Sequence, residues 1–528
     1  KTDIEALGLL KIDILALGML SAIHRCFDLI KEHYGQKLTM QDIPKKDTAT
    51  YDMLCKADSV GVFQIESRAQ MAMLPRLQPR CFYDLVIEIA IVRPGPIQGG
   101  MVHPYLKRRQ GLEAVNYPSP EIKSVLERTL GIPVFQEQVI RLAMVAAGFS
   151  GGEADQLRRA MASWSSKGGG NNQLAKFEQK LTNGMLKQGY SLDFAERLFK
   201  QIQGFGVYGF PESHSASFAL LAYVSAWLKC HYPAAFCCAI MNSQPMGFYS
   251  SSQLVQDAQR HNIGINPIDI NHSLWDHSLE KKAEKILDNT LDKNNKTMIR
   301  LGFRLIKGLN YSAALKIINA KKPFKSLSDL TARTGLSKAN LSLLSSAGAL
   351  QSITNNRRQA HWQTLAINSH EPLLERTMPD SDLQLSPPSE SDNIYADYNN
   401  TGLTLGRHPM SILREQFPLF RQCKRHSDLA EMGHQRFVRM AGIVTGKQRP
   451  GTASGVVFLT LEDETGNSNV VIWKSVQERC RQALLKAQLL MVKGVIETDG
   501  AVVHVIAQEL TDCSELLYQT DIRSRNFR

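Results

Sequence analysis

A single carboxylate interrupts an apolar run near the start of the 528-residue chain. The run is GLLKIDILALGML, residues 8–20, and the carboxylate belongs to Asp13. Aspartate is rarely buried without a partner, so Asp13 either caps a helix over residues 14–20 or lies in a dry site that binds a cation. The residue pattern alone favours the helix cap.

Two adjacent arginines are the second candidate for chemistry. Arg158 and Arg159 lie in GGEADQLRRAM, residues 151–161. A guanidinium suits bidentate contact with phosphate oxygens. Glu153 and Asp155 are local partners, so a structural ion pair is the favoured interpretation for either arginine alone. His214, which is flanked by serines, could equally cap a helix or be a buried hydrogen-bonding group.

The C-terminal zone alternates apolar and polar residues with a period of two, which is typical of strands. One helix-like stretch, residues 474–486, follows the third strand-like run. Five strands with a helix after the third is the order of an OB-fold barrel. The five runs are RFVRMAGIVTGK (436–447), GVVFLTLEDETG (455–466), NSNVVIW (467–473), QLLMVKGVIE (488–497) and GAVVHVIA (500–507).

The second of these runs offers an aromatic ring for base stacking. Val457, Leu459 and Leu461 share one face of the run, and Phe458 and Thr460 share the other. A phenylalanine on an open barrel face can stack a base, which contributes roughly 1–3 kcal/mol. The alternative is that Phe458 packs under a loop and the nearby basic residues are ordinary surface charge. Those basic residues, which could follow phosphates, are Arg436, Arg439, Lys447, Arg449 and Lys474.

The segment LIKGLNYSAALKII, residues 305–318, is similar to a helix-hairpin-helix motif. We expect a helix end, a turn over Gly308 and Asn310, and a second helix, with Asn310 in the left-handed conformation that asparagine tolerates. Such a hairpin directs backbone N–H groups at a DNA phosphate without reading sequence, so we assign DNA contacts to Lys307, Gly308 and Asn310. LSLLSSAGAL, residues 341–350, is a second candidate. The alternative is a plain helical pair with a glycine cap.

The remaining zones are mostly helical. Residues 9–15 predict a strand, followed by a helix that ends at Gly35. Residues 51–270 predict helices that are broken at the Pro- and Gly-rich segments RPGPIQGG and GFGVYGFP. Residues 380–400 hold five acidic residues, two prolines and no Lys or Arg, so we expect a solvated linker.

Composition sets the broad class of the protein. The chain is 43% hydrophobic, and its net charge of +12 favours a polyanionic partner such as nucleic acid. Its nine cysteines include no CxxC pair, so zinc and a disulfide framework are both unexpected, and a reduced cytoplasm fits best. The most apolar run, residues 215–228, is shorter than the roughly 20 residues that span a bilayer. The first residue is Lys1, so we expect a fragment of a longer chain or a processed product.

Several segments together resemble the C-family bacterial DNA polymerases, the alpha-subunit family of DNA polymerase III. These are GLLKIDILALGML, GVFQIESRAQMAMLPRLQPRCFYDLV, AIVRPGPIQGGMVHPYLKRRQG, VFQEQVIRLAM, GFSGGEADQLRRAM and GFPESHSASFALLAYVSAWLKCHYPAAF. FQIESRAQM, HPYLKRRQG, GFPESHSASFALL and CCAIMNSQPMGFYS resemble its error-prone, ImuC-type branch. The replicative branch has an Asn-Lys pair before its Ser-His-Ser, where this chain has Pro211 and Glu212.

The resemblance gives Asp13 a role as a metal ligand. The family's palm uses three aspartates, and Asp13 in KIDIL matches the third. Two Mg²⁺ ions about 3.5–4 Å apart would stabilise attack of the primer 3′-hydroxyl on the nucleotide α-phosphate. The paired aspartates would lie upstream of Lys1, since the only Asp-x-Asp here is Asp380/Asp382 in the expected linker. We therefore expect the fragment itself to be inactive.

The resemblance also assigns residues around the nucleotide. Lys11 resembles the family lysine near the triphosphate, and Arg158 and Arg159 match paired arginines near the incoming nucleotide. Arg93 matches the RPGP arginine, and Gln136 and Gln138 match the QEQ segment, without an assigned substrate contact. Glu212 replaces the usual lysine and puts a basic phosphate contact there in doubt.

The resemblance implies a multidomain α+β protein. The expected parts are the end of a nucleotidyltransferase-type palm (1–50), helical fingers (51–270), a tandem helix-hairpin-helix region (271–375), a linker (376–431), an OB-fold (432–512) and a C-terminal tail (513–528). The parent would be an error-prone polymerase that extends primed DNA across damage. It would use deoxynucleoside triphosphates and reach the sliding clamp through mutasome partner proteins. The alternatives are a replicative alpha subunit and a non-catalytic DNA-binding module.

Overall fold

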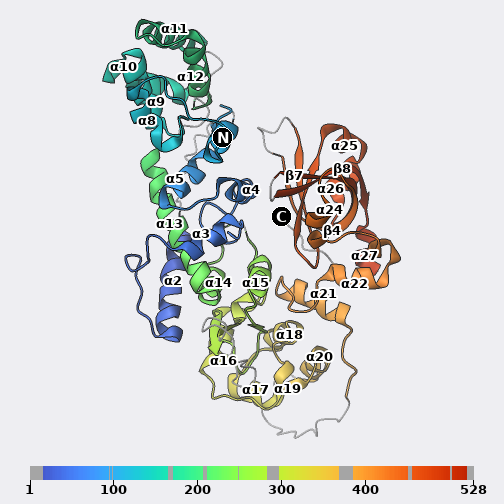
Figure 1. Cartoon of the computed structure of the whole chain (residues 1–528). Helices are drawn as coiled ribbons and strands as arrows, with labels where there is room; N and C mark the ends of the chain where they lie inside the picture. Colours follow the sequence, from blue (N-terminus) through green and yellow to red (C-terminus); the bar gives the residue numbers. More distant parts are fainter. Residues whose placement is uncertain are drawn as a thin grey trace. The chain divides into compact units, whose positions relative to one another are not determined.

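Figure 1 shows the computed structural model of the chain. The chain forms two compact units. The first comprises residues 1–27, 36–231 and 245–248, and the second comprises residues 28–35, 232–244 and 249–528. Lys11, Asp13 and the Asp380/Asp382 pair lie outside the described residues. The described residues are 16–93, 96–97, 99–163, 171–205, 211–247, 249–281, 297–367, 384–449, 455–499 and 502–519.

The first unit is helical, as its sequence pattern predicts. Helix α2 (Leu17–Tyr34), whose first part belongs to this unit, ends before Gly35, which adopts a φ of +71° as a left-handed helix terminus. The other elements are α3 (Thr48–Cys55), α4 (Arg68–Leu77), α5 (Phe82–Ile91), α7 (Val102–Arg109), α8 (Pro120–Leu126), η1 (Glu127–Thr129), α9 (Gln136–Ala147), α10 (Gly151–Ser163), α11 (Asn171–Lys187), α12 (Leu192–Phe205) and α13 (Glu212–His231).

Helices α5 and α13 pack against each other at the centre of the first unit. Every residue of α5 from Asp84 to Ile91 is buried, including the two acidic residues Asp84 and Glu88. Ser215 of α13 donates a hydrogen bond from its hydroxyl to the carbonyl oxygen of Val86 at 2.5 Å. Across the described residues, no helix combines the length and the apolar character needed to cross a membrane.

The second unit contains a small mixed sheet that the sequence pattern does not predict. Its strands are β1 (Ile265–Asn266), β2 (Ser278–Lys281) and β3 (Thr297–Arg300), in the order β1-β3-β2. Strands of two to four residues are too short for a period of two to be visible. The helices around this sheet are α14 (Pro233–Asn242), α15 (Ser251–Arg260), η4 (Phe303–Leu305), α16 (Tyr311–Asn319), α17 (Leu327–Thr334), α18 (Lys338–Ser346), α19 (Gln351–Thr354) and α20 (Arg357–Ala366).

The expectation of a solvated linker is wrong for the described part of residues 376–431. This part forms four helices, namely α21 (Glu390–Asn400), α22 (Pro409–Gln416), α23 (Pro418–Arg421) and α24 (His426–Met432). A capping box between Ser389 and Asp392 begins α21, and Ile394 is 1% exposed in a core that also contains Phe420. The acidic side chains of α21 pair with arginines: Glu390 with Arg407, Asp392 with Arg358 and Asp397 with Arg357.

The C-terminal part of the second unit is a closed five-stranded barrel. Its strands are β4 (Phe437–Gln448), β5 (Val457–Glu462), β6 (Asn467–Ile472), β7 (Leu489–Asp499) and β8 (Val502–Asp512), in the order β4-β5-β6-β8-β7. Helices α25 (Lys474–Arg479) and α26 (Arg481–Lys486) follow the third strand, and α27 (Ser514–Gln519) follows the fifth. Strands β6 and β8 pair in parallel and the other pairs are antiparallel. This arrangement confirms the predicted OB-fold.

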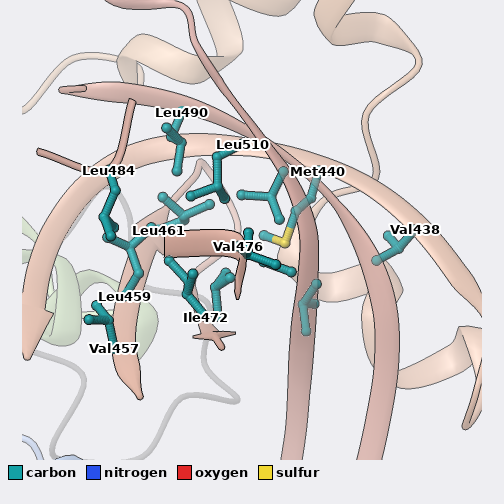
Figure 2. Packing of buried hydrophobic residues seen from close by; sticks show 14 of the residues in the cluster. Val438, Met440, Val457, Leu459, Leu461, Ile472, Val476, Leu484, Leu490 and Leu510 are labelled. Carbon is teal, nitrogen blue, oxygen red and sulfur yellow. The ribbon is translucent and has the colours of Figure 1, made fainter. Parts of the chain in front are cut away.

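The interior of the barrel is filled by apolar side chains from every strand and from both helices (Figure 2). Val438 and Met440 of β4 meet Leu459 and Leu461 of β5 in this core. Val476 and Leu484 contribute the apolar faces of α25 and α26. The alternation along each strand therefore sends the intervening residues to the outer surface.

Candidate nucleic-acid interface

The turn before α16 differs from the predicted hairpin. Gly308 has a φ of +85°, whereas Asn310 has a φ of −87° and a ψ of 157°. The Asn310 side chain accepts a hydrogen bond from the backbone N–H of Ala313 at 2.8 Å. The expectation of a left-handed Asn310 is therefore wrong: the asparagine is the N-cap of α16, and Gly308 provides the positive φ.

The element before this turn is the three-residue 3₁₀ helix η4 and not the end of a longer helix. Lys307 is exposed, but its ammonium group donates to the carbonyl oxygen of Tyr398 at 3.1 Å. Its backbone N–H donates to the carbonyl oxygen of Asn400 at 2.9 Å. In this structure Lys307 thus holds the end of α21 against the turn.

Two further turns in this region do connect helices at a glycine. Gly348, in the second predicted candidate, has a φ of +76° and lies between α18 and α19. Gly335 has a φ of +59° and lies between α17 and α18, whose N-cap is Ser337. The turn at Gly335 was not predicted, although a glycine followed by a serine N-cap is its signal.

On the barrel, the two faces of β5 are as predicted. Val457, Leu459 and Leu461 lie in the interior core. Phe458 lies on the outer side and is half-buried. Thr460 shares the outer side but is only 2% exposed, so the open part of this face ends near Phe458.

Phe458 is one end of an apolar line that crosses all five strands on the outer side. The strand pairings Phe437–Val495, Val495–Ile506, Ile506–Val471 and Val471–Phe458 join β4, β7, β8, β6 and β5 in turn. We name these five residues the outer row. With strands about 4.8 Å apart, the four steps span roughly 19 Å. A phenylalanine stands at each end of the row.

Exposure varies along the outer row: Val471 is buried, whereas the Phe437 end lies outside the part of the barrel surface that is covered by helices. Ala441 and Leu489 are fully buried on the outer side, in a second core with residues of α22, α23 and α27. Phe437, four residues before Ala441 on the same side of β4, is 58% exposed. Aromatic rings on an exposed barrel face are typical of single-strand binding surfaces.

Basic side chains border one side of the outer row. Arg439 and Lys493 are paired across β4 and β7, two residues along from the Phe437–Val495 pair. Lys493 contacts Glu509 at 3.0 Å, and Arg439 donates to the side-chain oxygen of Gln422 at 3.1 Å. Arg436 is exposed and immediately precedes Phe437.

Lys447 is not part of this arrangement. Its ammonium group donates to the carbonyl oxygen of Leu485 in α26 at 3.1 Å. Burial lowers the pKa of Lys447, and the carboxylate of Asp512 opposes that shift. The structure thus separates two basic residues that the sequence analysis had grouped, because only Arg439 follows the outer face.

On α10, both arginines bind the same carboxylate. The Arg158 guanidinium lies 2.8 Å from Asp155 Oδ1, and the Arg159 guanidinium lies 2.7 Å from Asp155 Oδ2. The hydrogen bond from Arg158 is the main cause that lowers the Asp155 pKa. The predicted partner Asp155 is confirmed, whereas Glu153 pairs with Lys180 instead. The side chains of Arg158 and Arg159 are 43% and 75% exposed.

The other residues carried over from the family are held by neighbours within the first unit. Gln138 is buried. Its side-chain oxygen accepts hydrogen bonds from the backbone N–H groups of Val134 and Phe135, and its side-chain nitrogen donates to the hydroxyl of Thr129. Arg93 donates to the carbonyl oxygen of Ile89 at 3.0 Å and to Gln64 at 2.9 Å. Gln138 is thus a structural residue. Gln136 is half-buried at the start of α9.

Glu212 and His214 lie at the N-terminal end of α13. The Glu212 carboxylate accepts a hydrogen bond from the Tyr83 hydroxyl at 2.8 Å and lies 3.4 Å from Arg128. His214 is exposed and packs its ring on Phe218, with 4.3 Å between centroids. Arg128 thus brings a cation next to the position where this chain has a glutamate.

Three family models match the chain over the regions just described. The bacterial DNA polymerase III alpha subunit finger domain matches residues 19–189, and a helix-hairpin-helix motif matches residues 262–360. The OB-fold nucleic acid binding domain matches residues 438–512. These matches agree with a multidomain α+β chain that has helical fingers, a helix-hairpin-helix region and an OB-fold barrel.

Curated relatives match the chain along its whole length. An error-prone DNA polymerase from Saccharophagus degradans is 58% identical over 530 residues, which cover 100% of this chain and 50% of that protein. Error-prone DNA polymerases from Teredinibacter turnerae and Idiomarina loihiensis are 57% and 56% identical, also over 100% of this chain, and over 51% and 50% of theirs. The chain spans about half the length of these relatives.

Among solved structures, asparaginyl-tRNA synthetase from Pyrococcus horikoshii is similar over 16% of this chain and 21% of that chain, at 25% identity and a TM-score of 0.14. A likeness this limited has no bearing on function. The finger-domain match and the full-length identities are more extensive: the chain contains a region similar to the bacterial DNA polymerase III alpha subunit finger domain, and along its whole length it is similar to error-prone DNA polymerases.

Proposed function

We propose that this chain is the part of an error-prone DNA polymerase that closes on the nucleotide and holds the DNA. The parent would extend primed DNA across damage during damage-induced mutagenesis. The observation that carries the proposal is the match of all 528 residues to error-prone DNA polymerases. We further propose the domain limits given by the sequence, with helices α21–α24 packed beside the OB-fold in place of a linker.

Asp13 would supply one carboxylate to a pair of Mg²⁺ ions, and Lys11 would lie beside the triphosphate. Divalent ions at such a site stabilise both the attacking and the leaving oxygen of an in-line displacement. A carboxylate is the ligand type that Mg²⁺ prefers. The apolar residues around Asp13 would exclude water and strengthen its attraction for a cation.

Arg158 and Arg159 would bind the triphosphate of the incoming nucleotide. Their guanidiniums already converge on the two oxygens of Asp155, so a phosphate group with similar oxygen spacing could take its place. Because α10 keeps both side chains largely exposed, the exchange would need no change in the helix.

The outer row and its basic border would bind the single-stranded template. Phe458 and Phe437 would stack bases, and Arg436, Arg439 and Lys493 would follow phosphates. The glycine turns of the helix-hairpin-helix region would contact the backbone of primer-template DNA. We place the protein in the cytoplasm, with mutasome proteins as partners that provide access to the sliding clamp.

Primer extension by the full-length parent tests the catalytic proposal. Asp13→Asn should abolish nucleotide incorporation and leave primer-template binding largely intact. Arg159→Ala should raise KM for the nucleotide, whereas the matched control Arg197→Ala, an exposed arginine of α12 paired with Asp193, should not. Activity of Asp13→Asn within tenfold of the parent would refute the metal role, and a parent without incorporation would favour a non-catalytic DNA-binding module.

A further inference from the structure

We propose that Asp47, Cys230 and His231 form a binding site for a divalent transition-metal ion of the zinc class. Asp47 is the N-cap of α3, and Cys230 and His231 are the last two residues of α13. A carboxylate oxygen, the thiol sulfur and a ring nitrogen all lie within 4.8 Å of one another. This set of oxygen, sulfur and nitrogen donors is one that zinc takes.

No local sequence pattern predicts this site. Zinc was unexpected because the chain has no CxxC pair, but these ligands come from segments 184 residues apart. All nine cysteines are free thiols, so Cys230 is available as a ligand. Only the packing of the segment before α3 against the end of α13 brings the three side chains together.

Neighbouring groups hold the ligands in place, as is usual around metal ligands. The backbone N–H of Thr50 donates to Asp47 Oδ2 at 2.9 Å, and the backbone N–H of Asp47 donates to the Tyr223 hydroxyl at 3.1 Å. His231 packs its ring on Trp227, with 4.8 Å between centroids. His231 Nε2 lies 2.8 Å from Asp47 Oδ2, within hydrogen-bond distance.

The charge around the thiol favours a cation. The negative charges of Asp47, Asp58 and Asp52 lie near enough to the Cys230 thiol to act on it. These acids make the potential at the sulfur negative, although Lys229 pairs with Asp58 at 2.8 Å. A divalent ion would balance one thiolate and one carboxylate. Since all three ligands are half-buried, water could occupy the fourth position.

An ion pair between His231 and Asp47 is the competing explanation. It accounts for two of the three side chains, and a hydrogen bond between Cys230 and the Thr50 side chain accounts for the third. The two explanations differ in their response to metal: a metal site ties the segment before α3 to α13, so metal should stabilise the folded chain by mass action. An ion pair gives no such dependence.

Cobalt(II) is the probe, because its thiolate complexes absorb in the near ultraviolet. One equivalent added to the metal-free 528-residue chain should give a thiolate-to-cobalt band and the visible bands of tetrahedral cobalt. Cys230→Ser should lose the thiolate band, while the matched control Cys480→Ser, a half-buried thiol between α25 and α26, should keep it. His231→Gln should weaken binding by at least about tenfold.

Persistence of the thiolate band in Cys230→Ser, or absence of stoichiometric binding to the parent chain, would overturn the proposal. A melting experiment covers the case in which Cys230→Ser does not fold. Zinc should raise the melting temperature of the parent chain more than that of His231→Gln. An equal rise in both would show that zinc binds elsewhere. None of these measurements involves DNA, so they are independent of the proposed polymerase function.

Discussion

Phe458 and Val471 are paired across β5 and β6 on the outside of the barrel, while the next pair, Leu459 and Val470, lies in its interior. The alternation of a strand thus places an aromatic ring one residue away from the core. Because Val471 is also paired with Ile506, the ring belongs to the outer row and is not an isolated surface phenylalanine.

Removal of either terminal ring of the outer row should weaken single-strand binding. Phe458→Ala and Phe437→Ala should each reduce affinity for an oligothymidine roughly tenfold, because each stacked base contributes about 1–3 kcal/mol. Fluorescence anisotropy on the 528-residue chain measures the effect. Leu485→Ala is the matched control, since Leu485 is 65% exposed on α26 and away from the row. Three variants with equal affinity would contradict this role.

Arg439 and Lys447 should differ in their effect on the salt dependence of binding. Arg439→Ala should lower the slope of log K against log salt by about 0.7, the value for one phosphate contact on a single strand. Lys447→Ala should leave the slope unchanged, because the Lys447 ammonium caps α26. The slope is measured by titrating the same oligonucleotide at several salt concentrations. A larger change for Lys447→Ala than for Arg439→Ala would reverse the assignment.

The barrel could be predicted from the sequence because each strand carries its own signal. Val457, Leu459 and Leu461 alternate with polar or aromatic residues, and period-two alternation needs no information from other segments. The outer row could not be predicted in this way. Which residue of β8 lies beside Val471 depends on the register of parallel strands more than thirty residues apart, and no local pattern encodes that register.

For residues 390–432 the sequence suggested a linker, whereas the structure has packed helices. The acidic and amide side chains at the start of this segment make it polar on average and suggest a free chain. However, each helix buries only a few apolar side chains against the barrel. These include Ile394 of α21, Met410 of α22 and Phe420 of α23. Composition averages over these positions, whereas packing depends on them individually. The capping box at Ser389 was the local sign of a helix.

The sign of the stability change on substituting Asn310 with glycine distinguishes an N-cap from a residue in the left-handed conformation. As the N-cap of α16, Asn310→Ala should destabilise by about 1 kcal/mol, and Asn310→Gly by only a few tenths. A left-handed Asn310 would instead make Asn310→Gly stabilising. The measurement is the thermal midpoint, supported by hydrogen exchange of the α16 amides. Asn319→Ala, at the exposed end of the same helix, is the control and should have little effect.

His277 should make stability depend on pH below neutrality. The side chain is buried, and its Nδ1 accepts a hydrogen bond from the backbone N–H of Gly302 at 3.0 Å. Burial, followed by the nearby charge of Arg304, lowers its pKa to about 3. The unfolded chain binds a proton near pH 6.5, and the folded chain does not.

The sign of the effect follows from this difference. The neutral histidine's contribution to the free energy of unfolding is fully present above about pH 6.5 and is lost as the pH falls toward 3. The loss between pH 6.5 and pH 5 should be about 2 kcal/mol. Thermal midpoints across this range should therefore fall less steeply for His277→Gln than for the parent chain. His361→Gln, at an exposed histidine of α20, is the control and should show the same slope of thermal midpoint against pH as the parent chain. If His277→Gln also shows the parent slope, other groups control stability in acid.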